Sequence, residues 1–299
     1  MILRALCLAV TLLELPFAYA SADAPPAAEG NAALRYWQAF ATLPQFTEAE
    51  GRKLNVEYLT MPLDDQAREM VAKAEYALQM MHYGAALPRC EWGIGYEEGV
   101  YTRLPQANAA RVLACLACLR ARLRFDQGQR VEAVEDIVTA MTLGRHVSLE
   151  GGFIILLVGY HIEHRMMEIL AIYLPSLDPS MLKNLRSRLD ALPPFRSQAT
   201  MLRTDEERSL DWFVRKVKGA KDKESLLTLL SWIGASEGSS RDSAAEARAF
   251  LGACGGSSNG VLELAEKVRP CFERIAKKNG PAARSVREGI RARGDEPGR

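Results

Sequence analysis

The stretch LACLRARLRFDQGQRVEAVEDIVTAMTLGRH (116–146) decides the fold. Its apolar residues recur every three or four positions on both sides of a short polar segment, which is the pattern of two amphipathic helices. Gly128 lies in that segment and gives the backbone the freedom that a tight turn requires. Small side chains let two helices approach closely, so the stretch predicts an antiparallel helical hairpin. The small residues are spaced 7, 5 and 7 positions apart: Ala121, Gly128, Ala133 and Ala140.

Outside this hairpin the chain continues as further helices. Asn31, Asp64 and Asp178 are good N-cap residues, and prolines 105 and 179 fit the first turn of a helix. No run alternates convincingly between polar and apolar residues, so no strand is expected. We therefore predict an all-α fold, with antiparallel helical hairpins packed as an irregular bundle or a short repeat-like array. The expected helices cover about 31–43, 64–81, 105–125, 130–147, 153–173, 179–192, 196–218, 222–235, 243–251, 260–278 and 282–292.

The small residues of the central hairpin carry a resemblance to the tetratricopeptide (TPR) repeat. Ala121, Ala133 and Ala140 match the small positions of that repeat, and Gly128 lies near its turn. The large aromatic positions of the first repeat helix are missing, and Arg145 stands where a proline is usual. No second copy follows at a period near 34 residues. The hairpin is thus TPR-like, and a full solenoid is not expected.

On a wider scale the order of segments resembles a group of exported all-helical proteins from planctomycete-type bacteria. The segments are a signal peptide, NAALRYWQAF (31–40), the hairpin, LLVGYHIEH (156–164), and LPP (192–194) before a charged helix. The resemblance covers most of residues 31–220. Its motifs are packing motifs, so no activity follows from it.

The N-terminal residues are typical of a secretory signal peptide. MILRALCLAVTLLELPFAYA (1–20) has an early arginine, an apolar run and a small-x-small ending. The alternative is a retained membrane anchor, but Glu14 and Pro16 interrupt the apolar run and weaken a spanning helix. No later segment is long enough to span a bilayer, so we expect a periplasmic or secreted protein.

Composition shifts suggest how the chain divides. Residues 21–30 (SADAPPAAEG) are expected to be a flexible leader, followed by a helical-hairpin domain over 31–235. SEGSSRDS (236–243) and GACGGSSNG (252–260) favour a partly flexible, helical C-terminal extension over 236–299. Without Cys7 the exported chain keeps five cysteines, and Cys254 with Cys271 is the favoured disulfide.

The overall charge argues against polyanionic partners. The formal net charge is +1, so no overall field recruits nucleic acid or an anionic membrane.

Two cysteine and serine motifs of enzymes bear on catalysis. The chain has no G-x-S-x-G nucleophile motif. Cys115 and Cys118 form a C-x-x-C pair, but they lie within a predicted helix and are interpreted as small packing residues.

Two groups of residues could carry chemistry. His161, His164 and Glu168 follow i, i+3, i+7 spacing, so they share one helix face and could bind zinc or iron, with His146 as a further ligand. The alternative is a solvated polar face that Glu163 and Arg165 flank. The second group lies on the loop CEWGIGYEEGVY (90–101), where aromatic rings and carboxylates could contact a sugar or a cationic peptide. Its members are Trp92, Tyr96, Glu97, Glu98 and Tyr101. The alternative is a lid that tucks its rings against the core.

These observations leave two hypotheses. The first is an exported α-helical scaffold or binding protein without catalysis or cofactor, whose partner is another protein or a peptide. The second is a metal-dependent hydrolase that uses the histidine–glutamate cluster.

Overall fold

The structure, a computed structural model, describes residues 30–235, 243–271 and 274. All regular structure in these ranges is helical, which confirms the predicted fold class. Three predictions lie outside the described residues: the signal peptide over 1–20, nearly all of the leader, and the helix expected over 282–292. Among the residues described, no helix is both long and apolar enough to cross a membrane.

The helices follow one another with short connections, and the predicted caps are present. The side chains of Asn31, Asp64 and Asp178 each accept a hydrogen bond from a backbone N–H in the first turn that follows. The helices are α2 (Ala32–Ala41), α3 (Glu48–Asn55), α4 (Asp65–Lys73), α5 (Glu75–Ala85), α6 (Pro105–Asp126), α7 (Arg130–Val147), α8 (Phe153–Tyr173), α9 (Pro179–Asp190), α10 (Gln198–Asp205), α11 (Asp211–Gly219), α12 (Lys223–Ala235) and α13 (Ser243–Ala253), with 3-10 turns η1 (Glu57–Leu59), η2 (Gly99–Tyr101) and η3 (Leu174–Ser176), a π-turn η4 (Glu206–Leu210), and helical residues 258–271.

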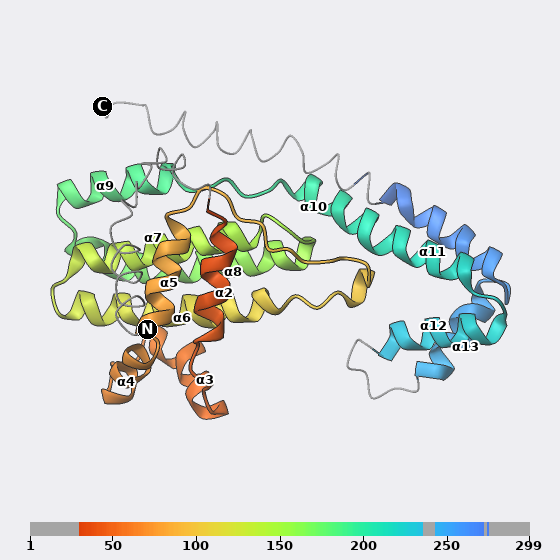
Figure 1. The fold of residues 1–299 in the computed structure, drawn as a ribbon, viewed down its shortest axis with the longest axis horizontal. Coiled ribbons are helices and arrows are strands. Elements are labelled where there is room, and N and C mark those ends of the chain that lie inside the picture. The colour runs from red at the N-terminus through yellow and green to blue at the C-terminus, as the bar shows by residue number, and fades with distance from the viewer. Residues whose placement is uncertain (1–29, 236–242, 272–273, 275–299) are drawn as a thin grey trace, which may run out of the picture.

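The long helices α6, α7 and α8 form the centre of the bundle (Figure 1). α6 and α7 pack along each other and are joined at Gly128, whose φ of +77° is one that glycine adopts readily. Ala121, Ala133 and Ala140 are fully buried in this pair. α2 packs on α5, and α5 in turn packs on α6 and α7.

α7 and α8 approach each other at two glycines. A Cβ atom placed on Gly159 would lie 2.7 Å from the carbonyl oxygen of Gly144, closer than real side chains approach a backbone atom. The absence of side chains at both positions therefore sets the short distance between these helices.

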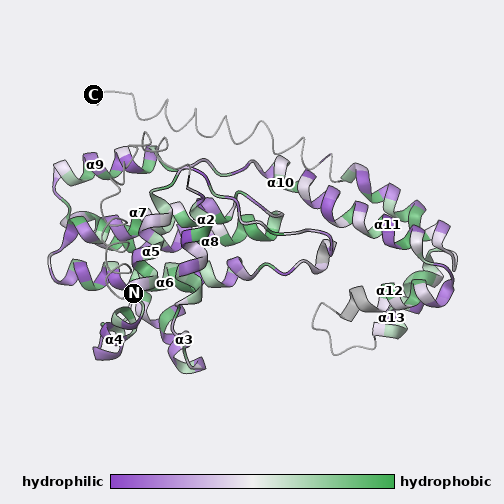
Figure 2. Ribbon diagram, viewed as in Figure 1, coloured by the Kyte–Doolittle hydropathy of each residue, from purple (hydrophilic) through white to green (hydrophobic). Residues whose placement is uncertain are grey.

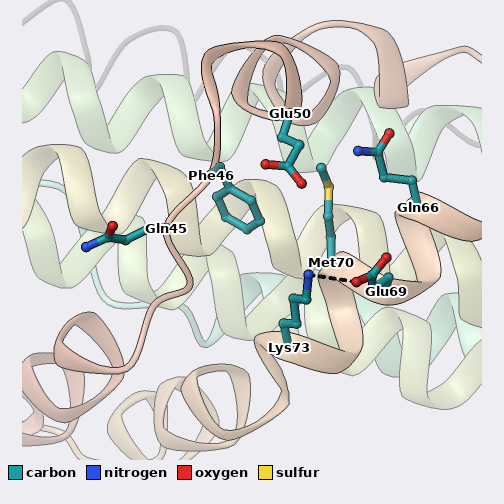
Figure 3. Close-up of a pocket in the computed structure, with 7 residues that line it drawn as sticks. All are labelled: Gln45, Phe46, Glu50, Gln66, Glu69, Met70 and Lys73. Carbon is teal, nitrogen blue, oxygen red and sulfur yellow. Dashed lines mark ion pairs between the residues drawn. The ribbon is translucent and has the colours of Figure 1, made fainter.

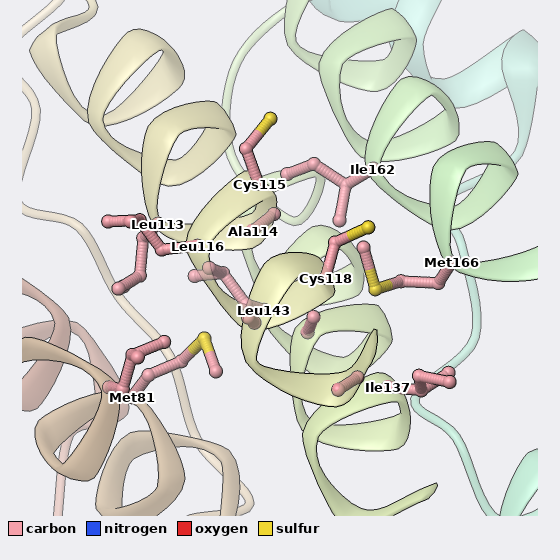
Figure 4. Close-up of a cluster of buried hydrophobic side chains, with 14 of the residues drawn as sticks. Met81, Leu113, Ala114, Cys115, Leu116, Cys118, Ile137, Leu143, Ile162 and Met166 are labelled. Atoms are coloured by element: carbon pink, nitrogen blue, oxygen red, sulfur yellow. The ribbon is translucent and has the colours of Figure 1, made fainter. Parts of the chain in front are cut away.

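The core of the bundle is built from leucine, methionine, alanine and cysteine side chains. Figure 4 shows Leu116 and Leu143 between the helices, while the sulfur of Cys118 lies beside Met166. Figure 2 shows hydrophobic and hydrophilic residues mixed along α6 and α7, as expected for helices that bury only part of their surface. Each fully buried leucine contributes roughly 1.5–3 kcal/mol to folding, so this layer dominates stability.

Two features of the N-terminal half differ from the sequence prediction. One helix was expected over 64–81, but the chain bends at Ala74, which separates α4 from α5. Ala74 is fully buried and continues the apolar spacing of both helices, so the pattern alone does not reveal the bend. α3 was not predicted, although Thr47 and Glu50 form a capping box at its start.

A second, smaller core lies at the far end of the molecule (Figure 1). α10, η4 and α11 lead to it, and it contains Val217 of α11, Leu226 of α12 and Leu251 of α13. Sequence composition placed a boundary at residue 236. The second core begins upstream of that point, because it includes Val217 of α11 and Leu226 of α12, and α12 packs on α13.

The cysteines are all reduced in the described residues. Cys254 is half-buried and Cys271 is exposed, and the expected disulfide between them is not formed. Cys115 and Cys118 are buried, which confirms their interpretation as packing residues. Burial raises the pKa of the Cys118 thiol to about 12, so this thiol is a poor nucleophile.

Candidate functional site

The predicted ligand loop tucks its largest ring into the bundle. Trp92 is only 3% exposed and stacks between Tyr36 and Phe40, with ring centroids 5.6 and 5.9 Å away. Its indole N–H donates a hydrogen bond of 2.9 Å to the carbonyl oxygen of His146. Trp92 therefore anchors the loop and is not available to stack on a ligand.

The other two rings of the loop pack against the π-turn and α11. The guanidinium of Arg208 lies 3.5 Å above the centre of the Tyr96 ring, and Tyr101 contacts Trp212 edge-on at 5.6 Å. Gly99 has a φ of +57°, and a Cβ atom there would collide with the indole of Trp212. The loop is thus a tightly fitted strap whose aromatic rings face the protein.

The acidic residues of the loop face solvent. Glu97 and Glu98 are exposed, and the rings beside them are half-buried or buried. Of the five predicted ligand contacts, these two carboxylates alone lie on an open surface.

The predicted metal ligands are not brought together. His146 is 1% exposed and lies inside the aromatic cluster, where its Nδ1 is 2.8 Å from the Tyr36 hydroxyl. Burial lowers the pKa of His146 to about 4, so the ring is neutral at ordinary pH. His146 is therefore a core residue and not a ligand.

His161, His164 and Glu168 lie on the exposed face of α8, as their helical spacing predicts. Nε2 of His164 lies 3.4 Å from a carboxylate oxygen of Glu168. Among the residues that the structure describes, no three histidine, cysteine or acidic side chains are arranged to hold a metal ion. The prediction of a metal site was therefore wrong for the described residues, and the three side chains form a polar helix surface. Arg165 was expected on that surface too, but it is buried.

The densest polar constellation was missed from the sequence. Asp136 on α7 is fully buried and accepts hydrogen bonds from Arg120 at 2.6 Å and from Arg124 at 2.7 Å. His82 on α5 is 2.9 Å from the same carboxylate through Nε2. The network ties α5, α6 and α7 together at one point. Arg120 and Arg124 lie on the helix next to that of Asp136, but His82 is 54 residues away from Asp136, so residue spacing gave no signal for the full network.

One part of this network has the order of a catalytic triad. Nε2 of His82 lies 2.9 Å from the Asp136 carboxylate and 2.8 Å from the guanidinium of Arg120, and its Nδ1 lies 3.2 Å from the hydroxyl of Thr139. A nucleophile needs access to substrate and donors for an oxyanion. Thr139 is 3% exposed in the middle of α7, where helical hydrogen bonds use the neighbouring backbone N–H groups. The arrangement is suited to holding helices together.

Four buried arginines fall into two pairs. Arg120 and Arg145 have acidic partners, Asp136 and Glu163. The remaining two have none among the described residues: Arg122 donates to the carbonyl oxygens of Tyr58 and Met61, and Arg165 donates to the carbonyl oxygen of Asn55.

Two open grooves flank α9. The groove between α8 and α9 has a volume of about 390 Å³ and an apolar lining. The groove between α7 and α9 has about 560 Å³, a more polar lining and an ion pair of 2.6 Å between Glu135 and Arg188. The α8–α9 groove is lined by Met167, Leu170, Ala171, Leu174, Leu182, Leu185, Arg186, Leu189 and Asp190.

A third cavity is too small to bind a ligand. It lies between α3 and α4 and has about 20 Å³, room for a single water molecule. Figure 3 shows its polar rim, including the ion pair between Lys73 and Glu69.

Comparison of the chain with protein-family models, with curated proteins and with solved structures gave no match.

Proposed function

We propose that this chain is an exported α-helical binding protein that holds a helical segment of another protein and catalyses no reaction. The observation that carries the proposal is the apolar groove between α8 and α9. Leu170 and Leu174 form one wall, and Leu182 of α9 forms part of the other. An open groove lined by leucines is the usual seat of an amphipathic helix, which places its own apolar side chains there.

The dimensions and the rim define the segment that fits. α9 has 12 residues and is about 18 Å long, so the groove accommodates roughly three turns of a helix. Arg186 and Asp190 lie at the edge, where they can pair with charges of either sign on the partner. The favoured ligand is a short amphipathic helix with leucine-type residues at i, i+3 or i+4, and i+7.

The alternative function, a metal-dependent hydrolase, has less support. It needs converging ligands, and His161, His164 and Glu168 instead occupy an open helix face, to which no other element of the described part of the chain adds a ligand.

The test is direct binding of a synthetic peptide. A fluorescently labelled amphipathic 14-residue peptide, of about the length that α9 can support, is titrated with the protein and followed by anisotropy. The expected dissociation constant is on the order of micromolar, and a peptide with alanine at the apolar positions should bind at least about tenfold more weakly.

A pair of variants distinguishes specific binding in the groove from non-specific hydrophobic binding. Leu182→Glu places a charge on the groove wall at a side chain that is 38% exposed. Leu34→Glu makes the same change on α2, at a side chain that is 63% exposed. Binding should be lost in the first variant and kept in the second. Equal affinities for both peptides, or equal losses in both variants, would show that the groove is not the binding site.

A further inference from the structure

We propose that α6 and α8 together form an oxyanion-binding site that takes a phosphate or sulfate group. The site lies on the face of α8 that carries the two histidines first considered as metal ligands. Its basic side chains are Arg111, His161, His164 and Arg165.

Helix geometry brings three of these side chains together. His164 and Arg165 follow His161 by three and four residues, so all three lie within one turn of α8. Arg111 is exposed on α6, which packs against α8, and its charge reaches His161. Arg111 and these three residues of α8 therefore lie near one another where α6 and α8 meet, with the two histidines exposed and Arg165 buried.

Arg165 distinguishes this patch from an ordinary solvated face. It is 7% exposed, donates only to the carbonyl oxygen of Asn55, and has a buried Nε without a partner. Arg145, on the neighbouring helix α7, is equally buried but has the carboxylate of Glu163 as a bidentate partner. Since a buried cation is costly without a counter-charge, Arg165 is poised to receive an anion, and its planar guanidinium matches a tetrahedral oxyanion.

The surrounding charges favour the same ligand. Burial and then the positive charges of Arg165, Arg111 and His164 lower the pKa of His161, and only Glu168 acts in the opposite direction. The local field is therefore positive. A bound oxyanion would raise the pKa of His161, and protonation of the imidazoles would in turn strengthen binding. Affinity should increase as the pH falls.

The site is separate from the proposed helix-binding groove. On a helical wheel of α8, Arg165 lies at one edge of the exposed face, and the groove residues Met167 and Leu174 lie at the other. Loss of one binding activity therefore need not affect the other.

The experiment is an NMR titration of the histidine resonances with inorganic phosphate, against chloride at the same ionic strength. His161→Gln assigns the signal. Phosphate should raise the pKa of His161, and it should bind at least about fivefold more tightly near pH 6 than near pH 8, where histidine loses its proton. O-phosphoserine serves as a second ligand. Tighter binding of this ester indicates a phosphate carried on a larger molecule, and equal binding indicates the free anion.

Arg111→Gln tests the site at an exposed position where folding is not at risk, and Arg215→Gln on the exposed face of α11 is the matched control. Phosphate affinity should fall at least about fivefold in the first variant and stay unchanged in the second. If phosphate moves the His161 titration no more than chloride does, or if Arg111→Gln binds phosphate as well as the control does, the patch is not a specific oxyanion site and the proposal is overturned.

Discussion

Replacing Asp136 with alanine should destabilise the protein more than loss of any surface ion pair. The carboxylate is fully buried and is shared by Arg120, Arg124 and His82 at 2.6, 2.7 and 2.9 Å. Arg120 is only 5% exposed, so its charge would stay in the core without its main partner. Removal of one member of a buried pair costs about 3–5 kcal/mol.

The magnitude can be measured in two ways. Urea unfolding followed by far-UV circular dichroism gives the free energy of unfolding, which should fall by about 3–5 kcal/mol. For a chain of this size, each kcal/mol corresponds to about 2–4 °C, so thermal melting should shift down by about 6–20 °C.

Two further variants show whether the cost comes from the stranded charge. Glu75→Gln removes the other acid beside Arg120, but Glu75 has a side chain that is 60% exposed, so the expected loss is under about 1 kcal/mol. Asp136→Leu combined with Arg120→Met removes both buried charges and should recover part of the stability. If Asp136→Ala costs less than about 1 kcal/mol, the network does not hold the three helices together and the reasoning is refuted.

Three further predictions follow from the packing. Gly159→Ala should lower the free energy of unfolding by about 1–3 kcal/mol, because the added methyl group meets a carbonyl oxygen of α7. Gly252→Ala, on α13 with open space around it, should raise the free energy of unfolding by up to about 1 kcal/mol; urea unfolding measures both. The pKa of His146 is about 4 in the folded protein and near 6.5 in the unfolded chain, so the unfolded chain binds a proton more readily. The contribution of neutral His146 to the stability of the fold is therefore complete above about pH 6.5 and is lost as the pH falls towards 4. A His146→Gln variant should show a flatter stability–pH curve over that window, and an unchanged slope would contradict this assignment. Gly99→Ala should cost more stability than Gly128→Ala, since both need a positive φ but only the first also meets the α11 indole; equal losses would mean that the strap is not tightly fitted.

The sequence predicted the ends of helices well where glycines interrupt the helical spacing. The bounds expected for α7 and α8 coincide with those observed, because Gly128 and the glycines at 151–152 interrupt strong helical spacing. The bend at Ala74 was not predictable in this way, since a buried alanine fits both helices.

The polar interior was less accessible to sequence reasoning. The partners Asp136 and His82 are 54 residues apart, and nothing in either segment shows that they meet. Arg165 falls at the edge of the apolar sector on a helical wheel, where spacing does not decide between burial and exposure. The histidine stripe was placed on the correct face, but the charge of Arg111, which helps to lower the pKa of His161, comes from another helix and was not anticipated.

The glycine contact between α7 and α8 limits how sequences with this fold can diverge. A Cβ atom on Gly159 would lie 2.7 Å from the Gly144 carbonyl oxygen, and one on Gly144 would lie 3.1 Å from the Gly159 carbonyl oxygen, so a side chain at either position requires the facing helix to move. Substitutions would accumulate freely on the outer faces of α8 and α9, while these two positions change only together with their surroundings. Related sequences should therefore keep small residues at both positions, even where their surface residues have diverged.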